Sequence, residues 1–148
     1  MWEENIEVIL PNLHHKHTGV TSTVSRLLPI LEKSMVVVST GVKLSKQGKS
    51  IPLWKPLFIS RKNPRIWHAR RNNEMLLGII FKFIFFCNFK LIFTTSKQRP
   101  YSLFSRFLIS KMDKIIATSK SSQLFLSVPS EVISHGVDVE VFKPEKNK

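Results

Sequence analysis

The stretch RIWHARRNNEMLLGIIFKFIFFCNFKLIFTT, residues 65–95, contains the alternation of elements that decides the fold. It opens with an apolar run at 65–69 and a polar turn, and residues 73–86 then have the length and apolar content of a helix. A second apolar run follows at 90–95. A strand, a helix and a second strand in this order are typical of a unit whose two strands lie parallel.

The same alternation extends to both sides of this stretch. Further strands are predicted at 6–10, 35–39, 114–119 and 131–135, and further helices at 20–33, 102–112 and 120–126. The apolar runs are continuous, which is typical of strands buried on both faces. The sequence therefore predicts an α/β protein with a Rossmann-like, doubly wound parallel sheet, whose first helix is kinked or ends near Pro29. Residues 41–63 have no clear pattern.

Length and composition favour a single domain. The chain has 148 residues, of which 43% are hydrophobic, enough for one core but few for a two-domain enzyme of ordinary size. Its one cysteine, Cys87, lies in an apolar stretch, which favours a buried structural residue in a reducing compartment. The acidic start of the chain lacks the apolar core of a signal peptide, so we expect a cytoplasmic location.

The charge is strongly basic and unevenly distributed. The formal net charge is +13, and the residues from Lys33 to Met112 include sixteen Lys and Arg but one acid, Glu74. Such a region favours an anionic partner, which can be a phosphorylated sugar, an anionic lipid or a nucleic acid. Nucleic-acid binding usually adds aromatic residues interleaved with basic ones on one face, or a known module. The sequence has neither, so we predict no nucleic-acid partner.

Residues 75–93 are long and apolar enough to be considered as a membrane span. Lys82 lies near the middle, however, and a central lysine costs about 2.5–3.5 kcal/mol in lipid, while each Phe, Ile or Leu returns only a few tenths. A helix that ends near Phe86, a turn at Asn88 and a strand from Lys90 explain the same residues without a charge in lipid. We favour this second interpretation.

Polar residues follow the predicted strands, at the edge where open parallel sheets bind ligands. After the first strand, Gly19 precedes a predicted helix with Thr21 in its first turn, and the free N–H groups there can hold a phosphate. A plain turn explains the glycine equally well. His14, His15 and His17 lie in the same segment, but no second cluster of ligand residues supports a metal, so we predict no metal site.

The densest polar group follows the third predicted strand. Arg70 and Arg71 can each bind a phosphate or a carboxylate with two hydrogen bonds, and Asn72 and Asn73 can bond to sugar hydroxyls. Glu74 opens the next helix, where its charge suits the helix dipole. In the structural alternative, an asparagine caps the helix and the arginines lie in a solvated turn. We favour ligand binding for the arginines and leave both interpretations open for Glu74.

Two further polar groups are predicted at the same edge. TTSKQR, residues 94–99, places hydroxyls, an amide and a cation there, including Thr95 and Ser96. The serines of TSKSS, residues 118–122, are more typical of a helix cap than of a catalytic group. No residue stands out as catalytic.

The tail VISHGVDVEVFKP, residues 132–144, has the pattern of a hinge between two domains. Its glycine permits a turn or a close approach of backbone, Phe142 offers an apolar anchor, and Pro144 ends regular structure. This string closely resembles the linker that closes the N-terminal half of GT-B glycosyltransferases of family 4. The resemblance implies a domain over 1–144, the start of a linker at 145–148, and a hinge formed by His135, Gly136, Val137 and Asp138.

Five segments strengthen this resemblance, namely GVTST, RIWHARRNNEM, KLIFTTSKQR, MDKIIATSKSS and VISHGVDVEVFKP. In this order and spacing they are similar to the N-terminal domain of family 4 mannosyltransferases that build the inner core of bacterial lipopolysaccharide. The similarity covers nearly the whole chain and is weakest at 41–63. The pattern GVDxxxF is shared by the wider family, whereas WHARRNNEM is specific to a much narrower group of its members.

The resemblance implies an enzyme that retains the anomeric configuration, uses a nucleotide-sugar donor, GDP-mannose, and needs no metal or other cofactor. It implies that this half binds a lipid-linked acidic sugar acceptor. Donor phosphate would contact Gly19, Val20 and Thr21, and the acceptor would contact Arg70, Arg71, Asn72, Asn73, Glu74, Thr95 and Ser96. Many members have a histidine where Thr95 and Ser96 stand, so the role of that histidine is not transferred.

In this family the groups that grip the nucleotide belong to a second domain. We therefore expect the chain alone to be inactive and to need a donor-binding domain, for which a separately encoded C-terminal half is one candidate. The expected location is cytoplasmic and peripheral, on the anionic inner face of the cytoplasmic membrane. The alternative is a small basic protein that binds a membrane or a nucleic acid without catalysis.

Overall fold

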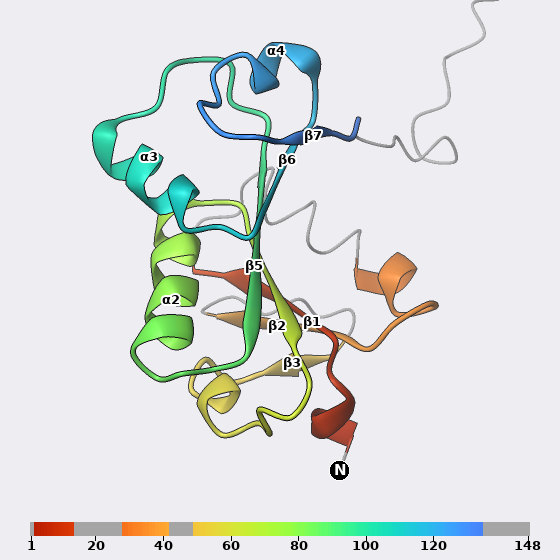
Figure 1. The fold of residues 1–148 in the computed structure, drawn as a ribbon. Coiled ribbons are helices and arrows are strands. Elements are labelled where there is room, and N and C mark those ends of the chain that lie inside the picture. Colours follow the sequence, from red (N-terminus) through yellow and green to blue (C-terminus); the bar gives the residue numbers. More distant parts are fainter. Residues whose placement is uncertain (1, 14–27, 42–48, 135–148) are drawn as a thin grey trace, which may run out of the picture.

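The computed structural model describes residues 2–13, 28–41 and 49–134, and these form a twisted sheet of seven parallel strands with helices against it (Figure 1). The strand order is β3-β2-β1-β4-β5-β6-β7. The chain moves outward from β1 in one direction and then crosses over to β4 and moves outward in the other. This topology confirms the predicted Rossmann-like, doubly wound sheet.

The elements have the following bounds. The strands are β1 (Val8–Asn12), β2 (Val37–Gly41), β3 (Ser50–Ile51), β4 (Arg65–Ala69), β5 (Phe89–Thr95), β6 (Lys114–Ala117) and β7 (Glu131–Val132). The helices are α2 (Asn72–Phe83), α3 (Leu103–Ser110) and α4 (Lys120–Gln123), with 3-10 turns η1 (Trp2–Asn5) and η2 (Lys55–Leu57). Residues 28–31 are also helical, so helical structure continues past Pro29, while the rest of the predicted helix 20–33 lies largely outside the described residues.

All six predicted strands are present, but the local sequence pattern predicts their ends less accurately than their existence. The first two strands begin two residues later than predicted, and β6 and β7 are shorter. The sequence did not predict β3. It consists of two residues that pair with Ser39 and Thr40 of β2, so its existence depends on a neighbouring strand and not on its own apolar pattern.

The sheet has apolar residues on both faces, and each face has its own cluster. The larger cluster lies under α2 and α3 and includes Ile9, Val38, Trp67 and Leu91. The smaller cluster lies on the other face and consists of Val8, Leu10, Leu28 and Val37, with partly buried neighbours. Alternate residues of one strand therefore enter different clusters, as period-two geometry requires. Every residue of β1, an interior strand of the sheet, is buried.

Trp67 on β4 organises the larger cluster. Its side chain is fully buried and stacks on Phe89 with ring centroids 5.7 Å apart, while Phe81 meets it edge-on at 5.4 Å. Its indole N–H donates to the backbone carbonyl of Glu74 at 2.9 Å. α2 passes close to the ring at Gly78, where an added Cβ would lie 2.5 Å from Trp67 Cδ1. A glycine is therefore needed in the middle of this helix for contact with the sheet, despite its low helix propensity.

Residues 75–93, considered above as a membrane span, are divided between two elements. α2 ends at Phe83 and β5 begins at Phe89, and Phe86 in the connection has a positive φ of 55°. Across the described parts of the chain, no helix is sufficiently long and apolar to cross a membrane. The structure thus confirms the preferred helix, turn and strand, with the helix ending three residues earlier than predicted, at Phe83.

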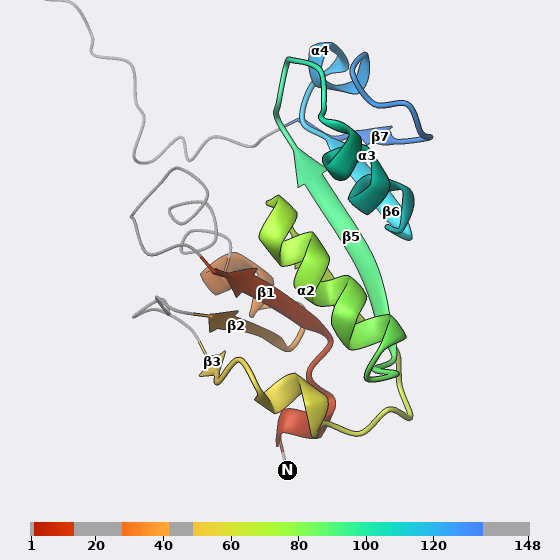
Figure 2. The same cartoon turned by 90° about the vertical axis from the view of Figure 1, so that its left-hand side faces the viewer.

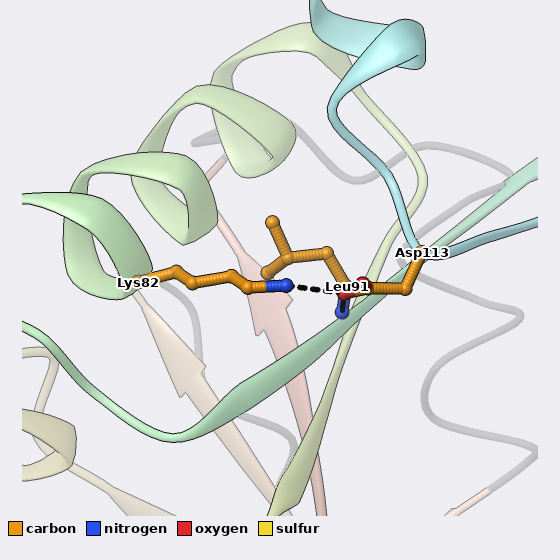
Figure 3. A network of polar contacts seen from close by, with 3 residues as sticks. All are labelled: Lys82, Leu91 and Asp113. Atoms are coloured by element: carbon orange, nitrogen blue, oxygen red, sulfur yellow. Dashed lines mark hydrogen bonds and ion pairs between the residues drawn. The ribbon is translucent and has the colours of Figure 1, made fainter.

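Lys82 shows why this segment tolerates a charge. Its Nζ donates to Asp113 Oδ2 at 2.7 Å, and the same carboxylate oxygen accepts the backbone N–H of Leu91 at 2.7 Å (Figure 3). Partial burial by itself raises the pKa of Asp113. The hydrogen bonds from Lys82 and Leu91 and the charges of Lys82 and Lys90 outweigh it and hold the pKa below its usual value. The pair joins the end of α2 to β5 and to the start of β6.

Cys87 is buried, as predicted. Burial raises the pKa of its thiol, although Arg61 opposes the shift, so the thiol form is favoured over the reactive thiolate.

Candidate functional site

The connection from β4 to α2 brings Arg70 and Arg71 to the carboxyl edge of the sheet. The residue at the N-cap of α2 is Arg71, which has extended backbone angles and makes no side-chain cap hydrogen bond. The predicted alternative of an asparagine N-cap is therefore wrong. Asn72 and Asn73 already belong to the first turn, and Asn73 Oδ1 only accepts the adjacent N–H of Glu74.

Glu74 lies beneath this connection and is fully buried. Its Oε2 accepts the backbone N–H of Arg70 at 2.8 Å, and the backbone N–H of Leu13 is a further donor toward it. Burial raises the pKa of Glu74, although these donors and the charges of Arg71 and Arg70 oppose the shift. Glu74 thus joins the end of the β1 strand to the β4–α2 connection, which is a positioning role. Its direct contact with an acceptor stays a prediction.

Arg70 is held in place by its surroundings. Its guanidinium is largely buried, and burial lowers its pKa while the charge of Glu74 partly offsets the shift. Its Nη1 is a buried donor without a hydrogen-bond partner among the described residues. A buried donor without a partner destabilises the fold by about 1–3 kcal/mol. A hydrogen bond to an anionic or hydroxyl oxygen of a ligand would remove this penalty. Arg70, Arg71 and Glu74 together carry a net positive charge.

The predicted acceptor residues that follow β4 and those at the end of β5 reach the same edge because the two strands are neighbours in register. The residues after β4 and those at the end of β5 also form hydrogen bonds with the segment that contains α3. Asn72 Nδ2 donates to Ser105 Oγ at 2.8 Å, and Thr95 Oγ1 lies 2.6 Å from Tyr101 Oη. α3 begins at an N-cap serine, Ser102, which accepts the backbone N–H of Ser105. The start of α3 therefore positions both candidate groups, which the sequence did not show.

The predicted contacts after β5 differ in exposure. Thr95 is buried and accepts the backbone N–H of Lys97, whereas Ser96 is exposed. Lys97 Nζ lies 4.5 Å from the ring centroid of Tyr101. Ser96 and the Lys97 ammonium are therefore better placed for a ligand than Thr95, whose hydroxyl is engaged. In TSKSS, Ser119 caps α4 by accepting the N–H of Ser122, which confirms the predicted cap.

His68 is a polar residue of this edge that sequence reasoning did not select. Its Nε2 lies 2.6 Å from Thr94 Oγ1 of the neighbouring strand. Burial, helped by the positive charge of Arg70, lowers the pKa of His68 to about 3, so the ring is neutral near pH 7. The signal was available in the alternation of β4, since Trp67 and Ala69 point to one face and His68 points to the other.

Stability is expected to fall on acidification because of His68. Its pKa is below the ordinary value of 6.5, so the unfolded chain takes up the proton first. The contribution of the neutral His68 ring to the free energy of unfolding is complete above pH 6.5. It is lost as the pH falls toward 3, by up to about 1.4 kcal/mol per pH unit. Urea unfolding of the wild type and His68→Gln between neutral pH and pH 5 measures this loss. The variant keeps a hydrogen-bonding side chain and does not titrate, so equal slopes for the two proteins would show that His68 is not the cause.

The remaining predicted site residues lie outside the described residues. They are the donor-phosphate residues Gly19, Val20 and Thr21, the three histidines at 14, 15 and 17, and the hinge residues His135, Gly136, Val137 and Asp138. The domain boundary at 144 lies there as well, and all of these stay predictions. In the part of the chain that the structure does describe, no three His, Cys, Asp or Glu side chains are grouped so that they could hold a metal ion.

The chemistry of the described edge is that of binding. It offers guanidinium groups, an ammonium, amides and hydroxyls, which hold anionic and hydroxylated ligands. The carboxylate of Glu74 is buried beneath the arginines, and the imidazole of His68 is bonded to Thr94.

Comparison with known proteins shows similarity to curated bacterial mannosyltransferases. The chain is 38% identical, over an alignment of 153 positions, to the lipopolysaccharide core biosynthesis mannosyltransferase LpcC of Rhizobium leguminosarum bv. viciae. It is 37% identical, over an alignment of 154 positions, to the lipopolysaccharide core biosynthesis mannosyltransferase LpsB of Rhizobium meliloti (strain 1021). The alignments cover 95% and 97% of this chain but 41% and 42% of the relatives. No sequence model of a protein family matches the chain.

These matches confirm the resemblance that the segments around WHARRNNEM indicated. The chain spans about two fifths of the length of the curated relatives. Over nearly its whole length, this protein is a homologue of lipopolysaccharide core biosynthesis mannosyltransferases.

Proposed function

We propose that this chain is the acceptor-binding half of a glycosyltransferase that adds mannose during lipopolysaccharide core assembly. The complete enzyme transfers the sugar from a nucleotide-sugar, with GDP-mannose as the donor, to a lipid-linked acidic acceptor. The observation that carries this proposal is the pair of arginines at the carboxyl edge, held over the buried Glu74 in a homologue of core mannosyltransferases.

This arrangement supports an acidic acceptor. Arg70 and Arg71 supply two positive charges against the single carboxylate of Glu74, so the connection favours a phosphate or carboxylate on the sugar. Arg70 is preorganised because its backbone N–H is bound to Glu74 and its side chain is packed. Little conformational entropy is then lost when it binds a ligand, which increases affinity.

A second domain is needed for chemistry because of how charge develops in the reaction. Breaking the bond between sugar and phosphate leaves positive charge on the sugar and negative charge on the diphosphate. The transition state is stabilised by fixed donors on both sides of a cleft. The edge described above provides the acceptor side, and Gly19, Val20 and Thr21 are the proposed contacts of this half with the donor diphosphate.

The chain alone is expected to show no transfer from labelled GDP-mannose to a core acceptor, above a heat-killed control. Transfer is expected when the chain is joined to the part of a curated relative that it does not match. That part alone is the matched control and should also be inactive. Transfer by the unassisted chain would show that no second domain is required, and a joined protein that folds but uses no nucleotide-sugar would contradict the proposed function.

A further inference from the structure

His68 lies on the face of the sheet opposite to α2 and α3. The two helices cover the face that is turned toward the viewer in Figure 2, and Trp67 of β4 packs beneath them. Ile66, on the other side of the same strand, packs against the smaller apolar cluster. His68 is two residues further along β4, so its ring follows Ile66 on that face and lies nearer to the carboxyl edge of the sheet.

Thr94 fixes the position of this ring. In the paired strands β4 and β5, His68 lies opposite Ile92, and Thr94 is the next residue of β5 on the same face. Diagonal neighbours of this kind are within reach of each other, and His68 Nε2 lies 2.6 Å from Thr94 Oγ1. The hydrogen bond holds the imidazole near the end of the strand, directly before the β4–α2 connection.

Arg70 is the charged neighbour of this ring and follows it by two residues. Burial, helped by the positive charge of Arg70, keeps the pKa of His68 low, so the ring is neutral near pH 7. Glu74 supplies an opposing negative charge, but that charge acts on Arg71 as well as on Arg70. One carboxylate therefore serves two guanidinium groups, and the neutral ring beside Arg70 adds no charge of either sign.

The residue at position 68 therefore decides how much of the positive charge of Arg70 is available to a ligand. A carboxylate there would pair with the guanidinium, because opposite charges attract strongly where water is partly excluded. An aliphatic side chain would leave the Thr94 hydroxyl without its partner. A neutral side chain that hydrogen-bonds to Thr94 meets both requirements, and unprotonated histidine is such a side chain.

We propose that His68 is a positioning residue of the acceptor site, whose uncharged ring, held by Thr94, leaves the guanidinium of Arg70 to bind an anionic group of the acceptor. The donor that this group would meet is Arg70 Nη1, which is buried and lacks a partner among the described residues. The group is a phosphate or a carboxylate, since a guanidinium binds either with two hydrogen bonds. The inference rests on the proposed function, because it concerns the same acceptor site.

Titration of the folded chain with inorganic phosphate at constant ionic strength tests this role. The shifts of the backbone N–H resonances of the β4–α2 connection in NMR spectra report binding there, and Arg70→Gln gives the background of phosphate bound elsewhere on this basic chain. We expect His68→Glu to weaken the Arg70-dependent binding about tenfold or more. His68→Gln, which keeps a neutral hydrogen-bonding side chain, should retain the affinity within about twofold.

A double-mutant cycle shows whether His68 acts through Arg70. In the Arg70→Gln background, His68→Glu should change the phosphate affinity by less than about twofold. The matched control is Asn63→Glu, which adds the same charge at an exposed position before the amino end of β4 and should leave binding at the connection unchanged. Urea unfolding checks that each variant is folded, and the shorter His68→Asp replaces His68→Glu if that variant does not fold.

The possible outcomes separate this inference from the proposed function. Equal phosphate affinity of the wild type and Arg70→Gln would remove the acceptor site from the proposed function, and the inference with it. Arg70-dependent binding that the carboxylate at position 68 leaves intact, or weakens equally in both backgrounds, would overturn the inference alone. An equal loss in His68→Gln and His68→Glu would do the same, because the charge at position 68 would then not be decisive.

Discussion

Trp67→Ala is expected to lower the free energy of unfolding by about 3–5 kcal/mol, the usual range for a large aromatic residue in a core. The ring is fully buried between α2 and the sheet, and its neighbours Phe81 and Phe89 cannot fill the space without leaving their own contacts. The change also leaves the carbonyl of Glu74 without its indole donor. Urea denaturation followed by far-UV circular dichroism measures the effect.

Gly78→Ala provides a control, because the sign of its effect on the free energy of unfolding depends on Trp67. In the wild type, the added methyl would lie 2.5 Å from Trp67 Cδ1 and 3.0 Å from Leu91 Cδ2. Overpacking costs about 1–3 kcal/mol, which exceeds the gain of about 1 kcal/mol in helix propensity. In the Trp67→Ala background the space is open, so the same change should stabilise the protein. Stabilisation in both backgrounds would contradict the close contact between the helix and the ring.

Arg70→Ala or Arg71→Ala should lower kcat/KM for an acidic acceptor by about ten- to a hundredfold in an enzyme completed with a donor domain. This range corresponds to the loss of a charge-assisted hydrogen bond, about 1.5–3 kcal/mol. Hydrolysis of the donor without acceptor should change far less, because the second domain provides most of the donor contacts. The comparison of the two rates therefore separates acceptor binding from general damage.

Arg61→Ala is the matched control for these variants. Arg61 is exposed and donates to the carbonyl of Phe85, beyond the end of α2 that lies farthest from Arg70 and Arg71. Removing its charge should leave acceptor use unchanged. Since Arg70 is packed, its variant needs a check by urea unfolding. If the Arg70 and Arg71 variants lose stability while the folded fraction uses the acceptor normally, the arginines are structural and the acceptor assignment is wrong.

The choice between a membrane span and a helix, turn and strand for residues 75–93 was open to sequence reasoning because Lys82 makes lipid burial costly. The sequence did not show which residue pairs with that lysine. Asp113 is 31 residues away and meets Lys82 only when β6 lies beside β5. β3 was missed because its two residues form a strand only through pairing with β2.

In the candidate site, too, the sequence predicted part of the arrangement and tertiary contacts decided the rest. The polar residues after β4 and β5 were predicted to share one edge, because the carboxyl ends of parallel strands meet there. Their individual roles depended on contacts between elements. Glu74, Asn72 and Thr95 turned out to be engaged with Arg70, Ser105 and Tyr101, respectively. The pKa of His68 is lowered by burial, helped by the charge of Arg70, and the burial depends on packing that one dimension does not show.

The sequence by itself determined the parallel α/β class and the kinship with core mannosyltransferases, and it predicted the edge of the sheet where ligands would bind. These properties depend on periodicity, strand order and motif, all of which are local or ordered along the chain. Only the tertiary structure decided that Gly78 makes room for Trp67, that Glu74 is buried under the arginines, and that His68 and Thr94 are joined by a hydrogen bond. Those properties depend on distances between residues far apart in sequence, which packing alone sets.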